Sequence, residues 1–180
     1  MKIIFPILLL AFSQLALADQ KDARLPELFE QLKSARNQTE ASQYEFRIWD
    51  IWAEHPNPEI NALMKTAMDE LGGDQYATAL RLFTQIIERE PDFAEAWNMR
   101  ATTQYILGNY RESEADIMKT LELEPNHFGA LSGLSAVYVE LEQYNAARNA
   151  LLRALEINPT MESAIMNLEA LRRFFNATAI

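Results

Sequence analysis

The fold is decided by one stretch, AEAWNMRATTQYILGNYRESEADIMKTLELEP (residues 94–125), because a looser copy of it lies on either side. The copies keep a constant step of 34 residues, which separates Pro91, Pro125 and Pro159, Tyr76, Tyr110 and Tyr144, and the small residues Ala67, Ala101 and Ser135. A fixed period of this length indicates a stacked array, in which each unit buries its apolar face only against its neighbours.

Each copy predicts two helices joined by a short turn. The turns fall at Gly72–Asp74, Gly108–Asn109 and Glu142–Gln143, and each second helix ends at a proline, which cannot continue it. A residue able to cap the next helix follows each proline directly: Asp92, Asn126 and Thr160. Each proline therefore stops one helix where the neighbouring unit begins the next.

The residue pattern resembles the tetratricopeptide repeat. The matching positions are Ala67, Ala79, Phe83 and Pro91 in the first copy, Trp97, Ala101 and Pro125 in the second, and Leu134, Tyr138, Ala147, Leu151 and Pro159 in the third. The resemblance implies an all-α fold, an α-solenoid of three helix-turn-helix repeats at 59–92, 93–126 and 127–160. An N-terminal helical hairpin precedes the repeats and a C-terminal capping helix, 161–180, follows them. As a whole the chain is similar to the small periplasmic tetratricopeptide-repeat proteins of proteobacteria.

The first residues are typical of an export signal. One lysine, Lys2, precedes an apolar run, and Ala16 and Ala18 flank Leu17, so residues 1–18 are predicted to be a signal peptide cleaved after Ala18. The alternative is an uncleaved membrane anchor, but the run is shorter than the roughly 20 apolar residues that a span needs. We therefore expect an exported protein of the periplasm, with no membrane insertion after cleavage.

Residues 19–58 predict a polar tether and a helical hairpin. Leu25, Leu28, Phe29 and Leu32 share one helix face, and a second helix, about 40–53, carries Tyr44, Ile48, Ile51 and Trp52. The hairpin is expected to cover the open face of the first repeat, as the terminal units of such arrays do. The alternative is that Trp49 and Trp52 form an aromatic platform for a ligand.

Composition and charge exclude several classes of function. The chain has 16 Lys and Arg against 26 Asp and Glu, a net charge of −10, and such a surface repels nucleic acid and anionic lipid. It has no cysteine, and its two histidines, His55 and His127, have no second ligand at a metal-binding spacing. No hydrolase, phosphate-loop or zinc motif is present. We expect no metal, no cofactor and no catalysis.

The resemblance also implies where a partner binds. The first helix of each repeat lines the inner surface of the superhelix in this family, which predicts a groove for a peptide segment or helix of a partner protein. Its residues here are Asn61, Met64, Met68 and Leu71, then Glu95, Asn98, Thr102 and Tyr105, then Gly129, Ser132, Ala136 and Val139, and finally Ser163 and Met166. Family members that grip a chaperone's C-terminal carboxylate use cations on this face, and none stands at these positions.

The favoured function is therefore a non-catalytic adaptor or scaffold. The alternative is a structural homo-oligomer, or an assembly factor of the cell envelope, that acts through its caps. Phe174 and Phe175 either seal the last layer, which we favour, or form a patch for self-association. Arg100 is expected to pair with an acid such as Glu70 or Asp116.

Overall fold

The computed structural model describes residues 20–178, all of whose regular elements are helices. They are α1 (Leu25–Lys33), α2 (Gln38–Ala53), α3 (Pro58–Gly72), α4 (Tyr76–Arg89), α5 (Ala94–Ile106), α6 (Tyr110–Leu123), α7 (Phe128–Glu140), α8 (Tyr144–Ile157) and α9 (Glu162–Thr178). The prediction of an all-α solenoid is confirmed. The predicted signal peptide, residues 1–18, lies outside the described residues.

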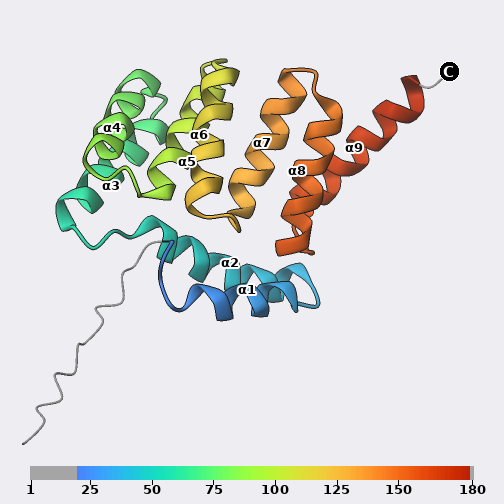
Figure 1. Cartoon of the computed structure of the whole chain (residues 1–180), viewed down its shortest axis with the longest axis horizontal. Coiled ribbons are helices and arrows are strands. Elements are labelled where there is room, and N and C mark those ends of the chain that lie inside the picture. Colours follow the sequence, from blue (N-terminus) through green and yellow to red (C-terminus); the bar gives the residue numbers. More distant parts are fainter. Residues whose placement is uncertain (1–19, 179–180) are drawn as a thin grey trace, which may run out of the picture.

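Helices α3 to α9 stand side by side in chain order and form the array (Figure 1). The pairs α3–α4, α5–α6 and α7–α8 are the three hairpins, and α9 packs on α8 as the closing helix. Large apolar residues fill the space between layers: Phe83, Ile86 and Phe93 are fully buried where the first unit meets the second. The repeated apolar positions thus form a continuous core.

The turns inside the three hairpins repeat one backbone geometry. Asp74, Gly108 and Glu142, each 34 residues from the next, have φ values of 59°, 77° and 58°, in the left-handed region. The residue after each one donates its N–H to the carbonyl five positions earlier, as in Asn109 to Gln104 at 2.9 Å. This pattern satisfies carbonyls that a helix end leaves without partners.

Arg100 forms an ion pair within the second repeat and a hydrogen bond to the first. The Arg100 Nε and Nη2 atoms each donate to a carboxylate oxygen of Asp116 at 2.7 Å, and the guanidinium lies 4.8 Å from the Trp97 ring centroid. Arg100 also reaches Thr84 on α4 at 3.3 Å. Of the two acids expected to pair with Arg100, the structure selects Asp116.

The N-terminal hairpin is present, but the prediction that it covers the open face of the first repeat is wrong. Helices α1 and α2, which we call the strap (residues 25–53), lie across one edge of the array, beneath α5, α7 and α8 (Figure 1). The buried face of the strap packs on Phe128, Ile157 and Met161. A side chain fixes this position as well, because Asn158 at the end of α8 donates to Glu45 on α2.

The physical reason is the distribution of apolar surface. The exposed side of α3 is largely polar, with Lys65, Thr66 and Asp69 around the partly exposed Met68. The strap buries Leu28, Leu32, Ile48 and Trp52, and it packs on the apolar surface that Phe128 and Ile157 provide where α7 begins and α8 ends.

Helix α9 closes the last layer. Ala164 and Leu171 are buried against α8, and the half-buried Phe175 joins the same cluster. The Phe174 ring packs 4.5 Å from the Tyr144 ring, yet 41% of the residue stays exposed. Phe175 therefore serves as the predicted seal, whereas Phe174 faces both the layer and solvent.

Candidate functional site

The strap covers the first turns of the inner helices. The Trp52 ring stacks on His127 with centroids 4.1 Å apart and planes at 11°, and Trp49 meets the Phe128 ring edge-on at 5.6 Å. The Trp49 ring also rests directly on Gly129, one of the predicted groove positions. Trp49 and Trp52 therefore pack against the array itself and do not form an open platform for a ligand.

A buried polar network lies under these rings. His127 caps α7, because its Nδ1 accepts the Ala130 N–H at 3.0 Å. A ring nitrogen that accepts carries no proton, so the neutral imidazole donates its Nε2–H to the Glu95 carboxylate, 2.9 Å away. Asn98 donates to the same carboxylate at 3.3 Å. The sequence predicted Glu95 and Asn98 as groove residues, and the structure uses them to join α5 to α7.

The groove prediction therefore needs correction at several positions. Met64, Glu95 and Asn98 keep only 2%, 5% and 6% of their surface exposed, because core residues or the strap cover them. Asn61 exchanges two hydrogen bonds of 2.7 Å with the His55 backbone and holds the loop before α3. Gly129 is beneath Trp49. The strap thus removes the first-turn positions of α5 and α7 from the open surface.

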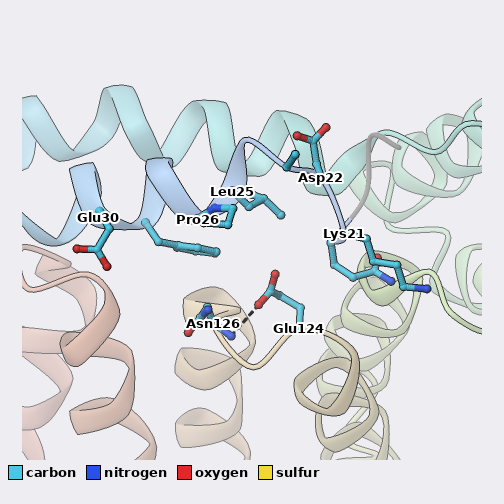
Figure 2. A pocket seen from close by; sticks show the side chains of 10 residues that line it. Lys21, Asp22, Leu25, Pro26, Glu30, Glu124 and Asn126 are labelled. Atoms are coloured by element: carbon cyan, nitrogen blue, oxygen red, sulfur yellow. Dashed lines mark hydrogen bonds between the residues drawn. The ribbon is translucent and has the colours of Figure 1, made fainter. Parts of the chain in front are cut away.

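The seam between the strap and the array contains an open cavity of about 510 Å³ (Figure 2). Residues 20–30 line it from the strap side, and Glu124 and Asn126 line it from the loop between α6 and α7. Glu124 accepts the Asn126 backbone N–H at 2.8 Å, and burial raises the pKa of its carboxyl above the ordinary value. The Glu124 carboxylate thus holds the loop, and the Asp22 carboxylate is likewise used in a bond to Arg24 at 2.7 Å. This cavity therefore belongs to the packing interface between the strap and the array.

The open part of the groove lies at the other end of the inner helices. A cleft of about 570 Å³ lies between α5, α7 and α9, with the start of α8 at its side. Its lining residues are Tyr105, Ser135, Ala136, Val139, Glu140, Tyr144, Asn167, Ala170, Leu171 and Phe174. Such a concave, mainly apolar surface with a few polar groups is typical of a binding site.

Three of the predicted groove residues, Tyr105, Ala136 and Val139, meet in this cleft. The others are dispersed. Met68 is exposed beside the end of α2, Leu71 packs in the first core cluster, and the exposed Thr102, the half-buried Ser132 and the exposed Ser163 and Met166 lie outside the cleft lining. The three that meet define the site, and the remaining positions do not extend it into one continuous groove.

Sequence reasoning missed the contribution of α9. Ala170 stands 34 residues after Ala136, so extending the groove positions by one more repeat would have included it. Phe174 and Leu171 follow on the adjoining part of the helix and provide the apolar wall. No comparable signal identifies Tyr144, which begins a second helix of a repeat and enters the cleft through its contact with Phe174.

The charge in the cleft is negative. Glu140 is the only charged residue of the lining, and it lies close enough to Tyr105 and Tyr110 to raise the pKa of both hydroxyl groups. Glu140 is the main cause for Tyr110, whereas burial comes first for Tyr105. The two tyrosine rings lie 5.5 Å apart. The cleft thus combines aromatic rings with one exposed carboxylate.

Between residues 20 and 176, no three His, Asp or Glu side chains gather as a metal site would require. The helices of this part of the chain are also too short or too polar to cross a bilayer.

Comparison with known proteins identifies the family. Two models described as "Tetratricopeptide repeat" match residues 82–115 and 129–161. A TPR repeat-containing protein of Rhizobium etli is 38% identical over 141 residues, which cover 78% of this chain and 69% of that protein. The chain is a tetratricopeptide-repeat protein. A rice SGT1 homolog is 40% identical over 78 residues, which cover 43% of this chain and 21% of that protein.

Solved tetratricopeptide-repeat domains share the fold. The Sgt2 domain of Aspergillus fumigatus superimposes with a TM-score of 0.64 at 21% identity, over 67% of this chain and 82% of that one. The first such domain of Spaghetti (RPAP3), bound to the HSP90 peptide SRMEEVD, gives 0.63 at 19% identity, over 65% and 93%. At these identities the likeness concerns the repeat architecture and not the partner.

Proposed function

We propose that this protein is a non-catalytic adaptor of the bacterial periplasm, which holds a peptide segment or short helix of a partner protein in the cleft between α5, α7 and α9. The observation that carries the proposal is the cleft itself. It is the open remainder of the repeat family's inner surface, with an apolar wall of Ala136, Val139, Leu171 and Phe174. The solved relative with a bound HSP90 peptide supports a peptide as the kind of ligand.

The chemistry of the lining favours binding over catalysis. Glu140 is exposed, and the remaining polar groups of the lining are amide and hydroxyl groups without a histidine, lysine or arginine near them in the cleft. General acid–base catalysis needs a pair of groups with suitable pKa values close to the reacting atoms. A surface with one carboxylate among aromatic and apolar side chains suits recognition.

The periplasmic location of the protein is part of the proposal. It is supported by the sequence of residues 1–18, with Lys2 before the apolar run and Ala16 and Ala18 at its end. We expect the mature chain to begin at Asp19. Mass spectrometry of the protein from a fractionated bacterial host measures this directly. A chain that retains Met1 and stays with the cytoplasmic fraction would contradict the periplasmic assignment.

The binding test uses light-activated cross-linking in the native cells. A photoreactive residue at Val139, which is exposed in the cleft, is compared with one at Glu112, which is exposed on α6 outside it. We expect one dominant protein to be captured from Val139 only. The substitution Ala170→Trp fills the cleft from an exposed position of α9 and should abolish the capture. Equal capture from both sites, or capture that survives Ala170→Trp, would refute the cleft as the binding site.

A second candidate is self-association through the closing helix. The partial exposure of Phe174 favours it, since an exposed aromatic ring at the end of an array can pair with another copy. Sedimentation over a range of concentrations separates the two candidates. A monomer at all concentrations refutes the homo-oligomer, whereas a dimer that the substitution Phe174→Ser converts to monomers would support it.

A further inference from the structure

The cleft of the proposed adaptor has a charge preference built into its wall. Glu140, at the last position of α7, is its single ionic group, and no lysine or arginine belongs to the lining. Within residues 20–176, Glu140 makes no ion pair, and Arg172 and Arg173 of α9 lie outside the lining. A cation that enters the cleft therefore meets a carboxylate that no other cation neutralises.

Glu140 has two tyrosine neighbours and keeps the capacity to bind a ligand. Tyr105 on α5 and Tyr110 on α6 are near enough for Glu140 to raise the pKa of their hydroxyl groups. A carboxylate offers about four acceptor positions. Because Glu140 is exposed at the end of α7, acceptor positions stay open to a ligand in the cleft.

Aromatic rings line the same cleft. Tyr105 packs 5.5 Å from Tyr110, and Tyr144 and Phe174 form a second pair of rings in the lining, 4.5 Å apart. Aromatic faces attract lysine and arginine side chains and also pack on their aliphatic stems. Rings beside a carboxylate are thus suited to a cationic side chain. A peptide with several acids, such as the SRMEEVD bound by the solved relative, would be repelled here.

We propose that the segment held in this cleft places a lysine or arginine against Glu140, beside the Tyr105 ring, and an apolar side chain beside Ala136, Leu171 and Phe174. This inference rests on the proposed adaptor function and specifies its partner: a basic segment with an apolar anchor. The overall charge of −10 acts in the same direction, because it speeds the approach of a basic partner at low salt.

The test selects ligands from a displayed library of random dodecapeptides on the full purified chain, with Ala170→Trp as the counter-selection that removes peptides bound elsewhere. We expect the cleft-dependent peptides to share a lysine or arginine near an apolar residue. Synthetic versions of one such peptide, with the basic residue replaced by glutamine or glutamate, are then compared by fluorescence anisotropy. Replacement by glutamate places two carboxylates together and should weaken binding about tenfold or more, which is a loss of ~1.4 kcal/mol or more.

Variants of Glu140 link the preference to this residue. Glu140→Gln removes the charge with little change of side-chain shape and should remove most of the preference for the basic peptide, while Glu140→Lys should reverse it. Glu156→Lys, at an exposed position of α8 outside the lining, makes the same charge change and should leave the preference intact. Circular dichroism verifies that each variant is folded.

The outcomes separate this inference from the function on which it rests. Cleft-dependent peptides without an enriched basic residue, or a preference that Glu140→Gln leaves unchanged, would overturn the inference and keep the adaptor function. A selection that yields no peptide sensitive to Ala170→Trp would overturn both. A preference that Glu156→Lys reverses as well as Glu140→Lys would show that net charge acts, and not the site, which also overturns the inference.

Discussion

The Trp49 ring occupies the space that a β-carbon on Gly129 would need. A Cβ atom built on Gly129 would lie 2.5 Å from Trp49 Cη2 and 2.7 Å from Cζ2, closer than real carbon atoms approach. The ring has little freedom to move, because Trp52, His127 and Phe128 all contact it, with centroids 5.2 to 5.6 Å away. Gly129 is therefore the point where the strap fits into the array.

This relationship predicts the effect of one added methyl group. Gly129→Ala should push Trp49 away and weaken the contact of the strap with α7. We expect it to lower the free energy of unfolding by ~1–3 kcal/mol, the usual cost of overpacking a filled site. Urea denaturation followed by tryptophan fluorescence measures the change, since Trp49 and Trp52 lie at the contact.

The same helix contains a matched control. A Cβ atom on Gly133 would lie 3.7 Å from Ile117 Cδ1, which is an ordinary contact. Gly133→Ala should be neutral or stabilise the protein by up to ~1 kcal/mol, because alanine is a better helix former than glycine. Equal destabilisation by both substitutions would mean that the Trp49 contact does not constrain Gly129.

The Arg100–Asp116 pair predicts an asymmetry between single and double substitutions. The Asp116 side chain is nearly buried, so Arg100→Leu leaves an uncompensated charge and should cost about 3 kcal/mol of stability. The double variant Arg100→Leu, Asp116→Leu removes both charges, and its free energy of unfolding should lie within ~1 kcal/mol of that of the natural protein. A double-mutant cycle by urea denaturation measures the coupling. A double variant as unstable as the sum of the two singles would contradict a specific pair.

Glu124 predicts a pH dependence of definite sign. Burial raises the pKa of its carboxyl in the folded protein, so the folded state binds more protons than the unfolded state. The penalty of burying the charge is absent well below the ordinary glutamate pKa of about 4.3 and grows as pH rises through the folded pKa. Glu124→Gln keeps an acceptor for Asn126. It should be more stable than the natural protein at neutral pH, and the difference should shrink on acidification.

The comparison of the two proteins across pH isolates this carboxyl. Other acids titrate in the same range, and Asp22 acts with the opposite sign because Arg24 lowers its pKa. These groups are common to both proteins and cancel in the difference between their unfolding free energies. A stabilisation that is the same at every pH would show that Glu124→Gln acts through packing and not through charge.

The array of helical hairpins was predictable from the sequence because the residues that specify it recur at a fixed period. Proline, tyrosine and small residues recur every 34 positions, and each recurrence fixes the same turn, cap or helix crossing. The two helices of the strap were predicted, but their position on the array was not, because Trp49 and Gly129 are 80 residues apart and no repeat links them. The cleft was predicted in part: the resemblance to the repeat family gave Tyr105, Ala136 and Val139, but burial under the strap removed Glu95 and Gly129.

The hairpin turns predict a cost that depends on backbone conformation alone. Gly108 has a φ of 77°, and no atom lies within 4 Å of the β-carbon position, so Gly108→Ala meets no neighbour. It should still destabilise the protein by ~1–2 kcal/mol, because a β-carbon disfavours the left-handed region. Gly72→Ala has equally empty surroundings without the positive φ, and it should be neutral or slightly stabilising. Thermal unfolding of both variants measures the difference. We expect the turn to keep its conformation, because Asp74, Gly108 and Glu142 share one geometry in the three hairpins. A Gly108→Ala protein as stable as the Gly72→Ala protein would contradict this and would mean that the turn relaxes to another conformation.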